Sequence, residues 1–253
     1  MAQISFFRYL RLKLSLYSPS ANGTPSLATK KPVVVNWHGS GFMLPSLGSD
    51  HDFYARIAKE TGFVVLDADY RKGPEVESRH QEFDLERVAI SGFSAGANLA
   101  LVASSCLKDS YPALKIQVTV AIYPPVDLSI DPEAKTVPHP IRPIPAAVAR
   151  IFDACYIPDD SLRSDPRISP TFADPALFPE AVVILTCSGD TLAPEGNAMA
   201  TKLQNGKRRV INQTLEGVGH AFDKGVREGT HEWEQRALAY STSITALKAG
   251  LGS

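Results

Sequence analysis

Residues 87–96 of this 253-residue chain have the sequence RVAISGFSAG. Val88–Ile90 form an apolar run without polar alternation, which is typical of a strand buried on both faces. The stretch Ala95–Lys108 that follows favours a helix. Cβ atoms at Gly92 and Gly96 would collide with the neighbouring strand and helix, so the turn between them requires glycine. The segment predicts a strand, a tight turn and a helix in direct succession.

Short apolar runs of the same kind recur along the chain, with helix-compatible stretches between several of them. The predicted strands are Val33–Asn36, Phe63–Leu66, Val88–Ile90, Val118–Ile122, Val182–Leu185 and the more polar Arg209–Leu215. The predicted helices are His51–Thr61, Ala95–Lys108, Ala146–Tyr156, Glu195–Gln204 and Glu232–Lys248. Parallel neighbours need a crossover of about a dozen or more residues, usually a helix, so this alternation predicts an α/β fold with a mostly parallel sheet.

Two segments depart from this alternation. Leu10 to Leu16 alternate with polar residues, which predicts an additional edge strand with one wet face. Residues 127–179 are rich in proline and contain one predicted helix and no predicted strand. We interpret them as a reduced, cap-like insertion over the carboxyl edge of the sheet, within a single domain of residues 1–253.

The composition excludes several classes of partner. With 26 Lys and Arg against 27 Asp and Glu, the net charge is −1, so the chain lacks the basic excess that nucleic acid or an anionic membrane attracts. No apolar run approaches the roughly 20 residues of a membrane span. Arg8, Arg11 and Lys13 interrupt the N-terminal segment before it reaches the length of an export signal. We expect no stable membrane anchor.

Cysteine and histidine spacing gives no sign of a metal or a disulfide framework. The three cysteines, Cys106, Cys155 and Cys187, are few and scattered, which favours a reducing compartment and a cytoplasmic location. Cys106 and Cys187 fall on helix and strand patterns that are typical of core positions. The remaining histidines without metal-ligand spacing are His51, His80, His139 and His231. We expect neither a metal nor a cofactor.

Ser94 lies at the centre of the glycine-bounded turn. Such a turn forces the serine into a strained backbone and places its hydroxyl at a helix N-terminus. A serine hydroxyl is a nucleophile only when a base takes its proton and an acid orients that base. Asp190 closes one later strand and His220 follows the next, so both belong to the same sheet edge as Ser94. Glu195, five residues after Asp190, is a competing candidate for the acid.

The sequence HGSGF at residues 38–42 follows the first buried strand. Small residues there let backbone amides approach a substrate oxygen closely. We predict an oxyanion hole from the amides of Ser40, Gly41 and Ala95, with His38 and Gly39 shaping the loop.

Five ordered motifs together resemble the α/β-hydrolase superfamily, within it the hormone-sensitive-lipase-like branch of carboxylesterases. They are HGSGF at 38–42, DYR at 69–71, GFSAG at 92–96, GDTL at 189–192 and GVGHAF at 217–222. The resemblance implies hydrolysis of small to medium carboxylic esters through an acyl-enzyme. An amidase, lactonase or acyltransferase on the same residues stays open, as does a ligand-binding relative that has lost catalysis. Residues 141–157 either line an acyl pocket or only cover the sheet.

The chain departs from the family pattern at three places. Ser40 stands where glycine is usual, which requires a negative φ, and Phe93 replaces a common acidic residue, which makes its surroundings more apolar. The connector at residues 71–87, RKGPEVESRHQEFDLER, stands where the family has a turn and a full amphipathic helix. Its 17 residues are enough for a crossover in length, but Phe83 and Leu85 are nearly its only apolar side chains. We expect one face of the central strands to be bare, and either a partner copy covers it in a homodimer or a coding segment near residues 75–78 has been skipped.

Overall fold

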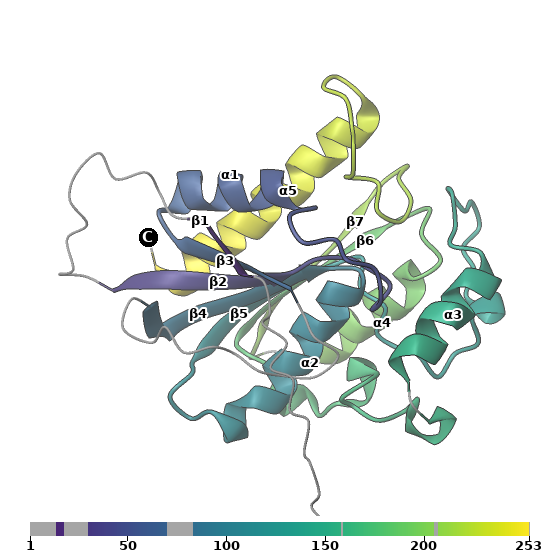
Figure 1. The fold of residues 1–253 in the computed structure, drawn as a ribbon, viewed down its shortest axis with the longest axis horizontal. Helices are drawn as coiled ribbons and strands as arrows, with labels where there is room; N and C mark the ends of the chain where they lie inside the picture. Colours follow the sequence, from purple (N-terminus) through teal and green to yellow (C-terminus); the bar gives the residue numbers. More distant parts are fainter. Residues whose placement is uncertain (1–13, 18–29, 70–82, 158, 205–206, 253) are drawn as a thin grey trace, which may run out of the picture.

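The computed structural model describes residues 14–17, 30–69, 83–157, 159–204 and 207–252. In these ranges the strands form one sheet in the order β1-β3-β2-β4-β5-β6-β7 (Figure 1). Their bounds are Leu14–Tyr17 (β1), Lys31–Trp37 (β2), Val64–Ala68 (β3), Phe83–Phe93 (β4), Ile116–Ile122 (β5), Ala181–Cys187 (β6) and Arg209–Leu215 (β7). Strands β2 to β7 are parallel, and β1 pairs antiparallel with β3 at one edge. The predicted α/β class and the predicted edge strand are confirmed, although Leu10 and Leu12 lie outside the described residues.

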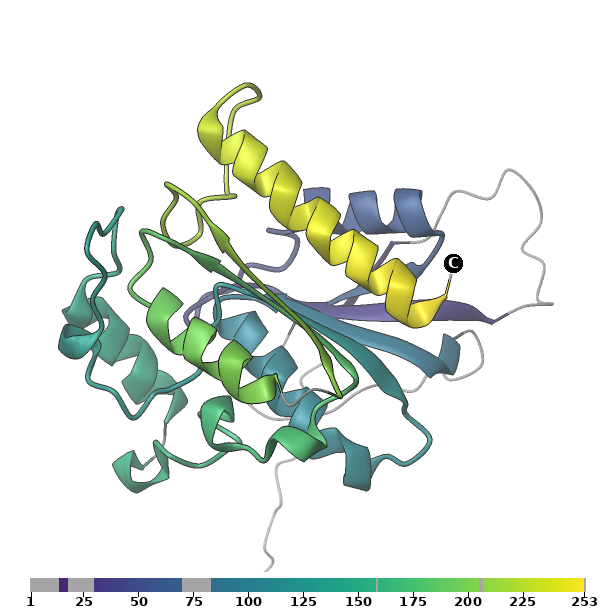
Figure 2. The ribbon, with the colours of Figure 1, turned by 180° about the vertical axis from the view of Figure 1, so that it is seen from behind.

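Helices cover both faces of the sheet. Their bounds are His51–Thr61 (α1), Ala95–Ser110 (α2), Ala146–Tyr156 (α3), Ala193–Leu203 (α4) and His231–Leu251 (α5). Figures 1 and 2 show α1 and α5 on one face and α2 and α4 on the other, while α3 lies apart beyond one end of the strands. None of the helices in the described ranges is long and apolar enough to cross a membrane.

Strand β6 shows why the central strands lack polar alternation. Val183 and Leu185 join the apolar cluster beneath α1 and α5, whereas Val182 and Ile184 join the cluster beneath α2 and α4. Every residue of β6 is buried. A strand covered on both faces needs apolar side chains at consecutive positions, as the sequence predicts.

The connector between β3 and β4 differs from its sequence-based interpretation. Strand β4 begins at Phe83 and not at Val88, so residues 83–87 extend the sheet, and the pairing with β2 shifts register along this extension. Four side chains on the face that we expected to be bare are each at most 9% exposed: Val33, Val64, Leu66 and Val88. The expectation of a bare face is wrong for these residues. Residues 70–82 lie outside the described residues.

Residues 127–179, which we call the 127–179 segment, contain α3 and four single 3₁₀ turns. These turns are Pro132–Ala134, Asp160–Leu162, Pro170–Phe172 and Pro175–Leu177. No strand occurs in this segment, which the structure describes except for residue 158. The Ile141 amide donates to the Gly189 carbonyl at 2.8 Å, just beyond the carboxyl end of β6. The segment therefore reaches the edge of the sheet at which the predicted site residues lie.

Candidate active site

Ser94 occupies the turn between β4 and α2. Its φ of 50° and ψ of −120° place a non-glycine residue in a sterically disfavoured region. A methyl group at Gly92 would overlap the Gly96 carbonyl, and one at Gly96 would overlap the Trp37 carbonyl at the end of β2. The predicted collisions and the predicted strain are both confirmed. This packing brings the start of α2 against the beginning of the HGSGF loop, with Ser94 between them.

His220 connects Ser94 to Asp190. The Ser94 Oγ atom lies 2.8 Å from His220 Nε2, and His220 Nδ1 lies 2.7 Å from Asp190 Oδ2. A carboxylate only accepts hydrogen bonds, so Nδ1 carries the proton and Nε2 is the acceptor for the serine hydroxyl. The side chains of His220 and Asp190 are 8% and 3% exposed. Burial keeps water from competing for these contacts.

Asp190 is held in place by its own strand end. Its Oδ1 accepts the Leu192 amide at 3.0 Å, and its backbone amide donates to the Cys187 carbonyl at 3.0 Å. Cys187 is fully buried on β6, as predicted for a core position. Burial raises the pKa of the Cys187 thiol far above its usual value, so this cysteine stays protonated.

Glu195, the competing acid, faces other partners. Its Oε1 accepts the amides of Val126 at 2.8 Å and Asp127 at 3.3 Å, and its Oε2 pairs with Lys135 Nζ at 2.7 Å. Burial raises the pKa of the Glu195 carboxyl, although Lys135 and the two amides favour its charged form. Of the two acids, Asp190 contacts His220, whereas Glu195 fastens the 127–179 segment to α4.

The HGSGF loop lies against Ser94. A methyl group at Gly39 would lie 3.3 Å from Ser94 Cβ. Gly41 has a φ of +55°, whereas buried Ser40 is not among the residues with positive φ, as its side chain requires. Among the described residues, neither the Gly41 nor the Ala95 amide donates a hydrogen bond to another protein group. These two N–H groups are therefore available to a substrate oxygen.

The His38 imidazole faces Asp69, a residue to which the sequence alone gave no role. Its Nε2 lies 3.4 Å from Asp69 Oδ1, and its Nδ1 lies 3.3 Å from the Gly39 carbonyl. The imidazole is 1% exposed. These contacts fit a histidine that shapes the loop. Asp69 belongs to the DYR motif, and its place in that motif was the one signal that pointed to it.

Two side chains of the 127–179 segment flank the site. A methyl group at Gly41 would lie 2.7 Å from the Phe152 ring, and one at Gly189 would lie 2.6 Å from the Ile141 side chain. Ile141 also leaves no room for a methyl group at Gly219, next to His220. Phe152 therefore packs on the HGSGF loop, and Ile141 packs between the loops that carry Asp190 and His220.

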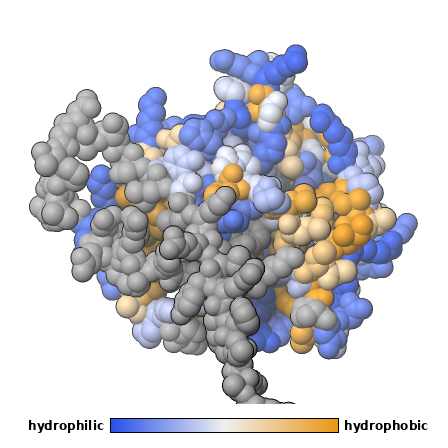
Figure 3. All heavy atoms as spheres, in the orientation of Figure 1, coloured by the Kyte–Doolittle hydropathy of each residue, from blue (hydrophilic) through white to orange (hydrophobic). Residues whose placement is uncertain are grey.

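A small cavity of mixed lining and the exposed apolar side chains of α3 lie beside the loop. A cavity of about 200 Å³ adjoins it, lined by His38, Ser40, Phe42, Met43, Leu44, Pro45 and Asp69. The Phe42 ring stacks on Tyr156 of α3 with centroids 3.9 Å apart. Figure 3 shows apolar atoms gathered over α3, where Val148 and Ile151 are 37% and 55% exposed. Within residues 141–157, Phe152 and Tyr156 contact the HGSGF loop and are therefore the candidates for lining an acyl pocket.

The sequence profile of a family described as the α/β hydrolase fold matches residues 34–81 and 75–224. The chain belongs to this α/β-hydrolase family, in its hormone-sensitive-lipase-like branch. The profile matches in two pieces that meet at residues 75–81, inside the short connector between β3 and β4. The discontinuity lies where the sequence analysis located the shortened segment.

Relatives and solved structures agree with this membership. An arylesterase of Saccharolobus solfataricus is 26% identical over 239 residues, covering 85% of this chain and 76% of that protein. An esterase of Acinetobacter venetianus is 30% identical, covering 77% and 69%. Human arylacetamide deacetylase-like 3 is 30% identical over 138 residues, covering 47% and 33%. The crystal structure of the thermostable carboxylesterase EstE1 from a metagenomic library shares the fold, with a TM-score of 0.75 at 24% identity, covering 96% and 85%.

Proposed function

We propose that this α/β hydrolase is a carboxylesterase that cleaves small to medium carboxylic esters with Ser94 as the nucleophile. The observation that carries the proposal is the continuous pair of contacts from Ser94 Oγ to His220 Nε2 at 2.8 Å and from His220 Nδ1 to Asp190 Oδ2 at 2.7 Å. Hydroxyl, imidazole and carboxylate in this order activate a serine without a cofactor.

The reaction follows from these contacts. Ser94 Oγ attacks the ester carbonyl carbon while its proton passes to His220 Nε2. The tetrahedral intermediate collapses, the bond to the leaving oxygen breaks, and that oxygen takes the proton from His220. A water molecule then attacks the acyl-enzyme with the same base assistance and releases the carboxylic acid. Asp190 holds the imidazole in the required tautomer throughout.

The negative charge on the intermediate needs hydrogen-bond donors. We propose the amides of Ser40, Gly41 and Ala95 for this role, since the loop lies against Ser94 and α2 begins at Ala95. The N-terminus of α2 adds a favourable field for a developing anion. Each donor of such a hole contributes roughly 10²–10³ in rate.

The expected substrate size rests on the 127–179 segment. We propose that it acts as a small cap within a single domain, because Phe152 packs on Gly41 and Ile141 packs beside Gly189. These two side chains limit the space on either side of the bond to be cleaved. Relatives named arylesterase and esterase support an ester as the substrate class.

The test is covalent labelling of the purified protein with a fluorophosphonate, followed by hydrolysis of p-nitrophenyl esters of graded acyl length. We expect labelling and hydrolysis in the wild type and neither in Ser94→Ala. Thermal unfolding of both proteins controls for folding. A folded wild-type protein that resists the probe and cleaves no ester would favour the ligand-binding alternative.

An amide substrate is the second candidate, because one relative is named arylacetamide deacetylase-like 3. The same acyl-enzyme chemistry cleaves an aryl amide when His220 protonates the leaving amine. Comparing kcat/KM for p-nitrophenyl acetate and p-nitroacetanilide separates the two. We expect the ester to be strongly preferred, and a preference for the anilide would transfer the assignment to an amidase.

A further inference from the structure

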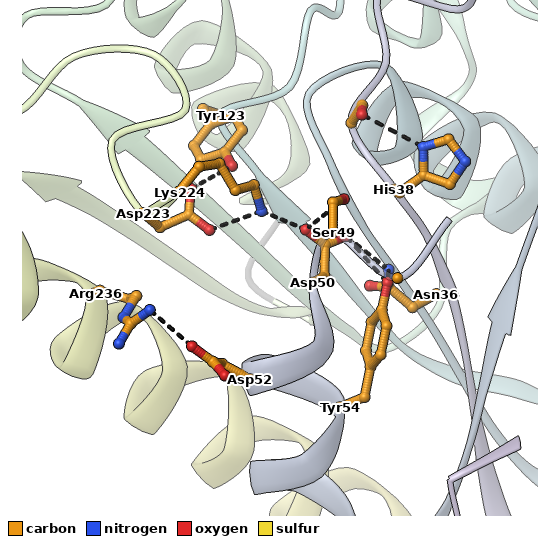
Figure 4. A network of polar contacts seen from close by, with 12 residues as sticks. Asn36, His38, Ser49, Asp50, Asp52, Tyr54, Tyr123, Asp223, Lys224 and Arg236 are labelled. Atoms are coloured by element: carbon orange, nitrogen blue, oxygen red, sulfur yellow. Dashed lines mark hydrogen bonds and ion pairs between the residues drawn. The ribbon is translucent and has the colours of Figure 1, made fainter. Parts of the chain in front are cut away.

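Lys224 belongs to a polar network that includes the buried residues Asp50, Asp223 and Tyr123 (Figure 4). The Lys224 ammonium is 2.9 Å from Asp223 Oδ2 and forms a second ion pair with Asp50 Oδ1. The side chains of Asp50 and Asp223 are at most 1% exposed. The ammonium also lies over the Phe93 ring, 4.2 Å from its centroid. A cation thus faces the aromatic side chain directly before the nucleophile.

Asp50 connects this network to two strands of the site. Its Oδ2 accepts a hydrogen bond from Asn36 Nδ2 at 3.3 Å, and Asn36 Oδ1 accepts one from Ser91 Oγ at 2.7 Å. Asn36 lies on β2, two residues before the HGSGF loop. Ser91 lies on β4, three residues before Ser94. The carboxylate of Asp50 is therefore linked to the strands that carry the oxyanion loop and the nucleophile.

Asp223 connects the other half of the network to the histidine. It follows His220 by three residues in the same loop, and its Oδ1 accepts a 2.6 Å hydrogen bond from the Tyr123 hydroxyl. The Tyr123 ring packs edge-on against the His220 imidazole, with centroids 4.9 Å apart. Tyr123 follows β5, and its amide donates to the Leu185 carbonyl at 2.7 Å. The histidine loop thus rests on the sheet through Tyr123 and Asp223.

The positive charge of Lys224 links the Asp50 side of the network to the Asp223 side. Burial opposes the charged ammonium, but the carboxylates of Asp223 and Asp50 outweigh it and raise the pKa of Lys224 above its ordinary value. The Lys224 ammonium contacts two buried carboxylates at once, which strongly restricts its position, because moving away from either leaves a buried carboxylate without its counter-ion.

We propose that Lys224 is a positioning residue for His220, fastening the histidine loop through Asp223 to Asp50 and so to the strands that carry the oxyanion loop and Ser94. This rests on the proposed roles of Ser94 and His220. Lys224 acts through other residues and needs no contact with substrate. Its removal affects the alignment of the imidazole with the hydroxyl, on which proton transfer depends strongly.

The first test compares Lys224→Met with Lys224→Arg. We expect Lys224→Met to lower kcat by about ten- to a hundredfold with KM changed less than about twofold, since misalignment of about 1 Å costs up to roughly a hundredfold. Lys224→Arg keeps the charge and restores most of kcat. The matched control is Arg236→Met, which removes the neighbouring 3.0 Å ion pair between α5 and Asp52 of α1 without touching the histidine loop. An unchanged kcat in folded Lys224→Met would overturn the proposal.

Tyr123→Phe is the second variant. It tests the proposed positioning of His220 even if Lys224→Met does not fold. It removes the hydroxyl bonded to Asp223 and keeps the ring against His220, while Lys224 and Tyr240 remain partners of Asp223. We expect a smaller fall in kcat at unchanged KM. A wild-type kcat in this variant would contradict the proposed connection between Asp223 and the histidine.

A readout without ester hydrolysis separates this proposal from the proposed function. The proton shared by His220 Nδ1 and Asp190 gives a low-field proton NMR resonance, assigned by its absence in His220→Gln. We expect the resonance in the wild type and in Lys224→Arg. In Lys224→Met we expect it to be lost or broadened, and in Tyr123→Phe we expect a weaker broadening. If the wild type shows the resonance, Lys224→Met loses it and the wild type cleaves no ester, the proposed function fails while the positioning role stands. A resonance unchanged in the folded variants means that Lys224 does not position His220.

Discussion

The Nδ1 atom of His220 lies 2.7 Å from Oδ2 of Asp190, the first of two acids that are five residues apart. The other oxygen of Asp190 accepts the Leu192 amide, so the carboxylate has little freedom to rotate away from the imidazole. Glu195 lies in the first turn of α4, where its Oε1 accepts the amides of Val126 and Asp127 and its Oε2 pairs with Lys135. The two acids therefore have separable roles, one at the histidine and one in holding the segment.

Because the two acids have different partners, we expect isosteric substitutions of them to change kcat by very different amounts. Asp190→Asn removes the acceptor that fixes the imidazole tautomer, so we expect kcat for p-nitrophenyl butyrate to fall by about 10⁴ with little change in fold. Glu195→Gln leaves His220 untouched, so folded protein keeps kcat within about tenfold. Steady-state kinetics and thermal unfolding of both variants provide the measurement. The reverse ranking of kcat would assign the catalytic acid to Glu195.

Phe152 predicts a limit on acyl-chain length. Its ring lies where a side chain at Gly41 would be, directly on the HGSGF loop. Phe152→Ala opens that space, so we expect the ratio of kcat/KM for p-nitrophenyl octanoate to that for the butyrate to rise by about tenfold or more, since each buried methylene contributes roughly 0.8 kcal/mol. The neighbouring Ile151→Ala, at a 55% exposed position of the same helix, is the control. Equal ratios in the wild type and both variants would remove Phe152 from the acyl site.

Sequence patterns were sufficient where the determining interactions are local. Helices α1 and α3 have the predicted bounds, and α1 ends where Gly62 adopts a φ of +74°. The turn around Ser94 leaves no room for a side chain at Gly92 or Gly96, because backbone carbonyl groups lie where their Cβ atoms would be. Any sequence that forms this turn therefore needs glycine at both positions. Strong local constraints of this kind are visible in the chain itself.

Long-range contacts explain what the sequence did not predict. The first residues of β4, from Phe83, alternate with charged residues and resemble a solvated connector, yet they pair with β2 across a register shift. Glu195 was weighed as a catalytic acid because of its proximity to Asp190, whereas its partner Lys135 lies 60 positions away. The ion pair of Lys224 and Asp50 joins residues 174 positions apart, and no local pattern marks either residue.

The buried pair of Lys135 and Glu195 predicts a stability loss that depends on pH. Their side chains are 9% and 6% exposed, so Lys135→Met leaves a buried carboxylate without its counter-ion and lowers the free energy of unfolding by about 3 kcal/mol at pH 8. Burial already raises the pKa of Glu195, and loss of the cation raises it further. The variant therefore takes up a proton on Glu195 more readily in the folded than in the unfolded state.

Urea unfolding at pH 5 and pH 8 measures this effect. Because the folded variant binds the proton more tightly, its stability rises as pH falls, and its deficit relative to the wild type is smaller at pH 5. Arg150→Met removes an exposed pair with Asp131 and Glu133 and serves as the control, with little change expected at either pH. A deficit for Lys135→Met that does not vary with pH would show that Glu195 stays ionised without its partner.

Asp67 predicts a second pH effect, of the wild type itself. Burial raises the pKa of this carboxyl, while hydrogen bonds from the Tyr54 hydroxyl at 2.7 Å and the Gly48 amide at 2.9 Å partly offset the effect. A carboxyl with a raised pKa binds its proton more tightly in the folded state, so its contribution to stability falls as pH rises from the unfolded pKa through the folded one.

In Asp67→Asn, the amide oxygen accepts from Gly48 and the amide nitrogen donates to Tyr54, so both contacts persist without a titrating group. Between pH 4 and pH 7 the free energy of unfolding, measured with urea, should therefore decline in the wild type relative to the variant, by about 1.4 kcal/mol for each unit of pKa difference. Parallel curves for the two proteins would mean that Asp67 titrates equally in the folded and unfolded states.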